Sequence, residues 1–322
     1  MLYRLLKFPA KLALLIWCRH LKINRRDILS SEGPLLIAAN HPNSFLDAIL
    51  VCTLFKENVF SLARGDVFKS KFNNRLLRAM NMLPVYRLSE GAENLEHNYK
   101  TFESCIDIFR QHGIVLIFSE GRCINEWNLR PLKKGTARLV LDAWEQNIPL
   151  KIIPLGINYS SFTSFGKNIE LNFGEYITIE NDLFKKHENY GSGVRSFNED
   201  LKKQLEKLVV QIKPPDKNII REKFEVPFSV CLRILLCIPA WLGYFLHAPL
   251  YFPIRRYSKK KFGKIDHYDS VIVGLSFILY PFYLALIAFL LWEFLGGYWW
   301  LLVFPIMPLL AISRVKIKMQ VV

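Results

Sequence analysis

Short apolar runs that end in turn residues recur through the first two thirds of the chain. Patterns of helical period separate these runs, and each run has the length and composition of a buried strand. This alternation predicts an α/β domain with a largely parallel sheet flanked by helices. The expected strands are 34–40, 58–65, 114–121 and 148–158, with a weaker one at 168–177, and the expected helices lie near 44–54, 70–80, 94–112, 135–146 and 198–212.

The pattern changes near Val226, after which long apolar runs dominate. Residues 271–292 form an uncharged run of 22 residues. As a helix this run would be about 33 Å long, which is enough to span a bilayer. A second apolar run covers 294–312, and Gly296-Gly297 interrupts the pattern near its start. We therefore predict a transmembrane hairpin at 271–312; the alternative is that these runs pack on themselves or on a partner as an apolar core.

The segment 226–254 carries charged residues and prolines within its apolar background. Such residues favour a broken, re-entrant or interfacial element over a crossing helix. A basic stretch follows at 255–264, and another lies at 313–318. Loops rich in Lys and Arg stay on the cytoplasmic side of a membrane. We therefore expect the protein at the cytoplasmic face of a membrane, the inner membrane if the protein is bacterial.

Three regions are expected along the chain. The N-terminal segment 1–26 mixes basic and apolar residues, and its apolar run is too short to cross a bilayer. It is predicted to be an amphipathic interfacial helix region, with a helix packed on the domain as the alternative. The stretch "KPPDK" at 213–217 breaks the last expected helix of the domain. The main domain is therefore expected at 27–215, and a C-terminal helical membrane region at 216–322.

The composition narrows the class of partner. The chain has 322 residues, a formal net charge of +15 and 51% hydrophobic residues. A basic balance suits nucleic acid or an anionic membrane surface. The sequence contains no nucleic-acid-binding motif, and its apolar tail favours membrane lipid as the partner. The six cysteines are scattered without a Cys-x-x-Cys pair, which suits a reducing compartment and disfavours a metal site.

Polar residues stand at the ends of three expected strands: His41, Arg64 and Glu120. Open parallel sheets place their sites at these strand ends. His41 is followed by Asp47, and the two side chains could form a catalytic base with its orienting carboxylate. Ser44 and Asp47 also resemble a capping box at the start of a helix, so a structural role for Asp47 stays open. Together with nearby cations, the pattern suits an anionic substrate that must lose a proton.

Four blocks of sequence, in order, resemble the glycerolipid acyltransferases, the family of glycerol-3-phosphate and 1-acylglycerol-3-phosphate acyltransferases. The resemblance covers roughly residues 35–160. Two departures stand out: five residues rather than four separate His41 from Asp47, and Asn81 stands where glycine is usual. The third block also has Ser119 for proline and lacks a threonine before Arg122. The blocks are "NHPNSFLD" (40–47), "NMLPVYR" (81–87), "FSEGR" (118–122) and "IPLKIIPL" (148–155).

The resemblance implies a reaction and a role for each site residue. His41 would be the general base on the acceptor hydroxyl, and Asp47 would orient it and stabilise the imidazolium. The donor would be an acyl thioester, either acyl-CoA or acyl carrier protein, and no cofactor or metal is expected. The residues expected to bind the substrate or shape its phosphate pocket are Arg87, Glu120, Gly121 and Arg122, with Arg64 and Lys133 as further phosphate contacts.

Two other functions remain open from the sequence. One is acyl transfer to a non-phosphate acceptor, such as an aminolipid or another lysolipid, which would keep His41 and Asp47 but not the phosphate role of the arginines. The other is a catalytically silent membrane protein that binds lipid. A nucleotide-binding enzyme is disfavoured, because the sequence has no glycine-rich loop of the kind that cradles phosphates.

Overall fold

The computed structural model describes residues 2–86, 93–180 and 189–318. Seven strands form one sheet in the order β1-β7-β6-β2-β5-β3-β4. All neighbouring strands are parallel except β6 and β7. The predicted α/β fold with a largely parallel sheet is therefore confirmed. The strands are β1 (Cys18–Ile23), β2 (Leu35–Ala39), β3 (Val59–Arg64), β4 (Met82–Val85), β5 (Ile114–Phe118), β6 (Lys151–Tyr159) and β7 (Lys167–Phe173).

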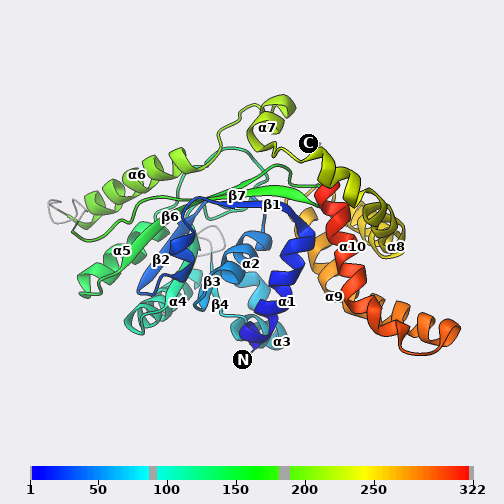
Figure 1. Cartoon of the computed structure of the whole chain (residues 1–322). Coiled ribbons are helices and arrows are strands. Elements are labelled where there is room, and N and C mark those ends of the chain that lie inside the picture. The colour runs from blue at the N-terminus through cyan, green and yellow to red at the C-terminus, as the bar shows by residue number, and fades with distance from the viewer. Residues whose placement is uncertain (1, 87–92, 181–188, 319–322) are drawn as a thin grey trace.

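Helices cover both faces of this sheet (Figure 1). In the central strand β2, Leu35 and Ile37 pack into a core shared with α1 and α2, whereas Leu36 and Ala38 pack into a second core shared with α4, α5 and α6. Every β2 residue is buried, which is why this strand reads as an uninterrupted apolar run. The domain helices are α1 (Leu2–Trp17), α2 (Phe45–Leu54), α3 (Lys71–Ala79), α4 (Glu93–Arg110), α5 (Gly135–Glu145), α6 (Tyr190–Leu208) and α7 (Lys217–Phe224), with short 3-10 helices η1 (Arg26–Ser30) and η2 (Gly65–Phe68).

The N-terminal region 1–26 differs from the prediction of a single helical region. The helix α1 ends at Trp17, and residues 18–23 form β1, an edge strand paired with β7. In this segment Leu21 and Ile23 alternate with polar residues, which is the period of a strand, and both pack against the core. Within residues 2–26, α1 is the part that could form the predicted interfacial helix. Several of its large apolar side chains are exposed: Leu5, Phe8, Leu12 and Leu15.

Beyond α7 the chain forms three long apolar helices. These are α8 (Val230–Phe262), α9 (Tyr268–Leu295) and α10 (Val303–Ile317), with the 3-10 helix η5 (Trp299–Leu302) before α10. Counting η5 with α10, three helices of the described chain are long and apolar enough to cross a membrane. The runs predicted to form a hairpin, 271–312, fall in α9, η5 and α10, which pack together through Leu284, Ala288, Val303 and Met307.

Of the alternatives predicted for 226–254, a broken element is wrong, because α8 is a continuous helix of 33 residues that begins at Val230. The re-entrant and interfacial alternatives stay predictions. Its three prolines lie inside the helix, and the stretch 255–264, predicted to be a loop, supplies its last turns up to Phe262. Prolines are tolerated in apolar helices where neighbouring helices supply compensating contacts. Here α8 packs on α10 and α9: His247 bonds to Tyr280, and the Tyr283 hydroxyl donates to the Leu246 carbonyl.

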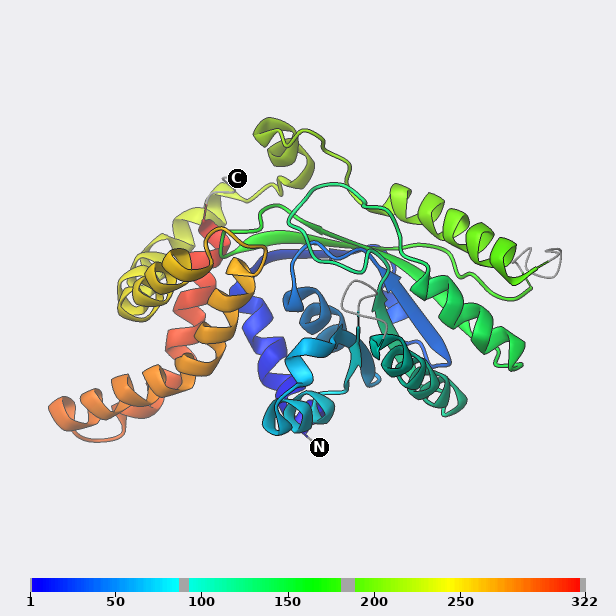
Figure 2. The same cartoon turned by 180° about the vertical axis from the view of Figure 1, so that it is seen from behind.

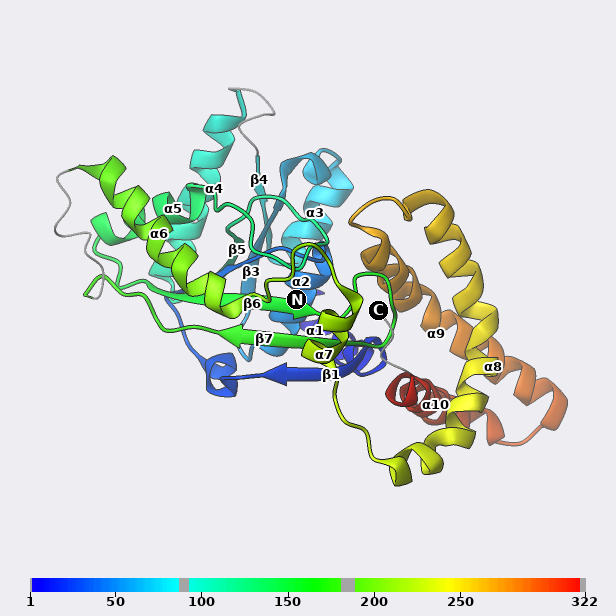
Figure 3. The same ribbon diagram turned by 90° about the horizontal axis from the view of Figure 1, so that it is seen from above.

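The C-terminal helices are attached to the domain at their bases. Lys316 Nζ donates to the Arg19 carbonyl at 2.6 Å, and the Arg19 guanidinium donates to the Lys316 carbonyl at 2.9 Å. Near the start of α8, Phe228 lies 5.5 Å from the same guanidinium, and after its end Asp266 accepts from the Asn125 amide. The segments just before and just after α8 therefore both contact the domain. Between these two contacts, α8 lies across α9 and α10 (Figure 3).

Candidate active site

His41 lies in the loop between β2 and α2 at the carboxyl end of the sheet, and Asp47 lies in the first turn of α2. The backbone amide of Ser119, at the end of β5, bonds to Ala39 and keeps the two strand ends together. The imidazole of His41 stacks on the Phe118 ring, with centroids 3.9 Å apart. Its Nδ1 lies 2.9 Å from Asp47 Oδ2. The two residues singled out from the sequence thus form a hydrogen-bonded pair at the edge where such sheets place their sites.

The Asp47 carboxylate is fully buried and is held by three donors. Oδ2 accepts from His41 Nδ1 and from the Asn43 amide at 2.8 Å, and Oδ1 accepts from the Tyr159 hydroxyl at 2.7 Å. A buried carboxylate needs such donors, because it has lost its hydration. Since an ionised carboxylate only accepts, His41 Nδ1 carries the proton and Nε2 is left with a free lone pair. This is the tautomer that a general base requires.

Only part of the predicted capping box is present. Ser44 is the N-cap residue of α2, but its side chain caps no amide among the described residues. Its hydroxyl lies 2.6 Å from His267 Nδ1 instead. Partial burial and the nearby charge of Arg64 lower the pKa of His267, so a neutral imidazole can accept from Ser44. Asp47 does bond to the Asn43 amide at the helix start, so it stabilises the loop and orients His41 at the same time.

Glu120 is buried, and its carboxylate faces the backbone of the site. Oε2 accepts from the His41 amide at 3.2 Å, and Oε1 accepts from the Arg130 amide at 3.0 Å. Burial raises the pKa of this carboxyl group, whereas the two amide bonds oppose that rise. Through these two bonds Glu120 links the loop after β5 to the backbone of His41. Gly121 follows with φ of +66°, a turn that glycine adopts without strain.

The predicted cations differ in their surroundings. Lys133 and Arg122 are exposed on the loops after β5, and a side chain at Gly121 would meet Lys133 Cγ at 3.0 Å. Arg64, at the end of β3, pairs with Asp66 at 2.6 Å. Arg87 lies outside the described residues. The roles of these residues and of Glu120 and Gly121 in binding a substrate stay predictions.

Several residues around the site had escaped the sequence reasoning. Tyr159 comes from β6 and Arg130 from the loop after β5; Arg130 Nη1 is buried and has no hydrogen-bond partner among the described residues. Asp269, in the first turn of α9, accepts from Asn43 Nδ2 at 2.8 Å. One signal was available for Asp269, because an ionisable residue beside a long apolar run is costly and indicates a partner. Nothing in the sequence pattern indicated Tyr159.

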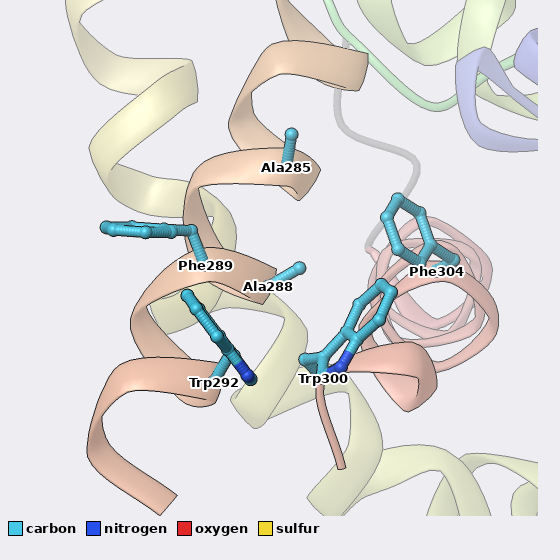
Figure 4. A pocket seen from close by; sticks show the side chains of 6 residues that line it. All are labelled: Ala285, Ala288, Phe289, Trp292, Trp300 and Phe304. Carbon is cyan, nitrogen blue, oxygen red and sulfur yellow. The ribbon is translucent and has the colours of Figure 1, made fainter. Parts of the chain in front are cut away.

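The described residues contain no group of His, Cys, Asp or Glu side chains arranged to hold a metal ion. An apolar cavity of about 310 Å³ lies elsewhere, near the turn between α9 and α10 (Figure 4). Its walls come from the hairpin alone, so it is separate from the residues around His41. The lining residues are Ala285, Ala288, Phe289, Trp292, Trp300 and Phe304.

Comparison with known proteins bears on this geometry. Residues 20–158 match the model of the Acyltransferase family, a stretch that contains the His41 loop, Glu120 and most of the sheet. The chain carries an acyltransferase-family domain. The resemblance to glycerolipid acyltransferases is thereby confirmed.

Two curated relatives from Saccharomyces cerevisiae are similar to part of the chain. Glycerol-3-phosphate O-acyltransferase 2 is 28% identical over 116 residues, and glycerol-3-phosphate O-acyltransferase 1 is 30% identical over 97 residues. These stretches cover 35% and 28% of this chain but only 16% and 13% of the yeast proteins. Among solved structures, the 1-acyl-sn-glycerophosphate acyltransferase PlsC from Thermotoga maritima aligns with a TM-score of 0.47 and 12% identity, over 70% of this chain and 81% of that one.

Proposed function

We propose that the protein is a membrane-bound O-acyltransferase. It moves a fatty acyl group from an acyl thioester to a hydroxyl of glycerol-3-phosphate or 1-acylglycerol-3-phosphate. The observation that carries the proposal is the His41–Asp47 pair at 2.9 Å, in which Nδ1 faces the carboxylate and Nε2 has no hydrogen-bond partner among the described residues. The acyltransferase-family match and the partial similarity to the two yeast enzymes give the reaction class.

The reaction begins with the acceptor hydroxyl bound against His41 Nε2. The base takes the proton as the hydroxyl oxygen attacks the thioester carbonyl, and such a base contributes about 10² to 10⁴ in rate. The buried Asp47 carboxylate stabilises the imidazolium that forms. Collapse of the intermediate breaks the carbon–sulfur bond, and the imidazolium returns its proton to the leaving thiolate. The attacking oxygen belongs to the substrate, so no acyl-enzyme is needed.

Cations near the site suit an acceptor phosphate. Arg122 and Lys133 project from the loops that follow β5, and Arg130 Nη1 is buried without a partner among the described residues. Guanidinium groups bind phosphate in a bidentate way, whereas a lysine ammonium binds it only as a point charge. Arg64 is paired with Asp66, which weakens its claim as a phosphate contact and leaves a non-phosphate acceptor as the second candidate.

A membrane site follows from the poor solubility of lysolipids and long acyl chains. The three apolar helices α8, α9 and α10 are long enough to enter a bilayer. The exposed apolar residues of α1 add a second contact, as in helices that lie in the interface. We place the active site at the cytoplasmic surface, because the basic end of α8 suits that side.

The test is an acceptor profile of the purified enzyme in lipid, with acyl-CoA and acyl carrier protein as alternative donors. We expect glycerol-3-phosphate or 1-acylglycerol-3-phosphate to be acylated. His41→Ala should lower that activity by a factor of about 10² to 10⁴. If only non-phosphate acceptors are acylated, the proposed acceptor is wrong and the proposed mechanism stands. Retention of more than about a tenth of the activity in a folded His41→Ala variant would remove the base assignment.

A further inference from the structure

Asp269 brings the C-terminal helices into contact with the catalytic loop. It lies in the first turn of α9, it is 2% exposed, and it is far in sequence from the acyltransferase-family match. One of its oxygens, Oδ2, accepts from the side-chain amide of Asn43 at 2.8 Å. Asn43 is itself fully buried, two residues after His41. A carboxylate of the C-terminal region thus lies inside the acyltransferase domain, beneath the loop that carries the base.

The charge of Asp269 is balanced by Lys167 at the start of β7. The two side chains form an ion pair, and both are almost completely buried. The ammonium of Lys167 also lies 5.6 Å from the Trp17 ring centroid and 5.8 Å from that of Tyr159. A buried pair of this kind loses much hydration and often adds little net stability. The contacts of the pair indicate another role, which is to hold neighbouring groups in place.

The contacts of Asp269 lead to His41 by two short routes. Asn43 bonds to Asp269 through its side chain and to Asp47 Oδ2 through its backbone amide. Lys167 contacts Tyr159, whose hydroxyl donates to Asp47 Oδ1. Each route ends on a different oxygen of the Asp47 carboxylate, which orients His41.

The same turn of the C-terminal region makes further bonds to the loop. Ser270 Oγ donates to the Asn43 carbonyl at 3.3 Å, and the Ser44 hydroxyl lies 2.6 Å from His267 Nδ1. Phe45 lies close to Gly274, so the start of α2 also packs on α9. Residues 267–274 therefore contact three consecutive residues of the catalytic loop, and Asp269 is the buried centre of these contacts.

We propose that Asp269 is a positioning residue for catalysis: by holding Asn43 it fixes the Asp47–His41 pair, so the C-terminal helical region completes the acyltransferase site. The proposal rests on the proposed function, in which His41 is the base. The C-terminal helices then have two roles, since they would anchor the enzyme in lipid and also set the geometry of its base.

The test compares two double variants that differ only at position 269. Both carry Lys167→Met, so neither leaves an unpaired buried ammonium, whose cost would confuse the result. One has Asp269→Asn, whose carbonyl oxygen can still accept from Asn43. The other has Asp269→Leu, which has a similar volume and no acceptor. Both are measured as the full chain in lipid, with Tm recorded for each.

We expect kcat of Lys167→Met/Asp269→Leu to fall about 10- to 100-fold, the size of effect that a misplaced catalytic group produces. The conservative double variant with Asp269→Asn should recover most of that loss. KM for donor and acceptor should stay within about threefold in both, because neither change touches the substrate. Equal kcat in the two double variants, at comparable Tm, would overturn the proposal.

A second readout does not depend on the acceptor. Modification of His41 by diethyl pyrocarbonate at a single pH, followed by mass spectrometry, reports how firmly the imidazole is held. In the structure its Nδ1 bonds to Asp47 and its ring stacks on Phe118. If Asp47 loses its hold on the imidazole, the rate of His41 modification should rise several-fold in the Leu variant and stay at the wild-type rate in the Asn variant.

The two readouts separate the failure of each proposal. If no tested acceptor is acylated by the wild type but the rate of His41 modification still rises only in the Leu variant, the positioning role stands and the proposed function falls. If the wild type acylates its acceptor and neither kcat nor the modification rate distinguishes the two variants, the positioning role falls and the proposed function stands.

Discussion

Ala38 in β2 and Phe282 in α9 are both apolar, yet Ala38 is fully buried whereas Phe282 is 70% exposed. The contrast holds for the two regions as wholes. In the domain, helices cover both faces of the sheet, as Figure 2 shows from behind, and large aliphatic side chains are buried between helices and sheet. In the C-terminal helices many large side chains are exposed, and the buried residues include small ones such as Ala240 and Ala288 beside larger ones such as Leu284 and Met307.

A lipid environment around the C-terminal helices, as proposed above, would account for the difference. In water, burial of large apolar side chains drives packing at about 25 cal/mol for each Å² removed. In lipid that driving force is absent between helices, so close contact of small residues and a few polar bonds takes its place. Gly243 on α8 is an example, because a side chain there would meet the Leu310 carbonyl of α10 at 2.3 Å.

Cysteine labelling tests the contrast most directly, because its result is all or none. With exposed Cys231 and Cys237 replaced, single cysteines are placed at Lys260, at Lys318 and at Tyr298 near the hairpin turn. An impermeant maleimide should reach positions 260 and 318 from the face that carries the domain, and position 298 only from the other face. The physical reason is that α9 begins and α10 ends against the domain.

Inverted vesicles provide the control for this labelling, since the pattern must then reverse. Labelling of positions 260 and 318 from opposite faces would refute the hairpin. Labelling of all three positions from one face would indicate that the helices lie on the membrane or pack as an apolar core.

Two glycines test whether the regions are equally close-packed. A side chain at Gly156 in β6 would meet the Leu208 carbonyl at 2.4 Å, nearly as close as Gly243 is to α10. Each Gly→Ala change should destabilise by about 1–3 kcal/mol, measured as loss of Tm in detergent. Gly156→Ala should also reduce kcat, because Gly156 lies on β6 close to Tyr159, whereas Gly243→Ala should affect mainly Tm.

Gly191→Ala in α6 is the matched control for both changes. There a side chain would meet only the Asn189 side chain at 3.4 Å, an ordinary contact. The better helix propensity of alanine should then stabilise by about 0.5–1 kcal/mol. A Gly243→Ala variant as stable as Gly191→Ala would mean that α8 does not pack tightly on α10.

Tyr159→Phe tests the support that the domain itself gives to Asp47. The change removes the hydroxyl that donates to Asp47 Oδ1 and leaves the ring in the core. Hydrogen bonds to charged groups contribute about 1.5–3 kcal/mol, so kcat should fall about 10- to 100-fold with little change in KM. A wild-type kcat would show that the bond from Asn43 alone keeps Asp47 in place.

The sequence predicted the parts of the fold that follow a local rule. Buried parallel strands appear as apolar runs, and β2, β3, β5 and β6 were expected close to their observed positions. The edge strand β1 was missed, because its polar residues and the preceding helix read as one amphipathic segment. The continuity of α8 was missed for another reason: His247 and Leu246 bond to tyrosines of α9, and no local pattern records such tertiary contacts.

The site divides in the same way. His41 and Asp47 could be predicted because they lie only six residues apart, in the loop after β2 and in the first turn of α2. Tyr159 and Asp269 could not, since they lie 112 and 226 residues from Asp47 and Asn43, their partners. Only the folded chain brings these residues together, and the C-terminal helices supply one of them.

Glu120→Gln should produce the smallest effect, through the pH dependence of stability. Burial raises the pKa of Glu120 in the folded protein, so its ionised form is disfavoured there. Stability from this group is therefore fully present below the unfolded pKa of about 4.3 and is lost as pH rises through the folded value. Glutamine does not ionise, but its NH2 group faces one of the two backbone amides at a cost of about 1 kcal/mol at all pH values. The stability advantage of the wild type over Glu120→Gln should therefore shrink as pH rises from about 4 to 8, measured by thermal unfolding in detergent.

Glu145→Gln, at the exposed end of α5, controls for the change in net charge. An advantage that grows with pH would mean that the amides of His41 and Arg130 hold Glu120 ionised more strongly than burial opposes it.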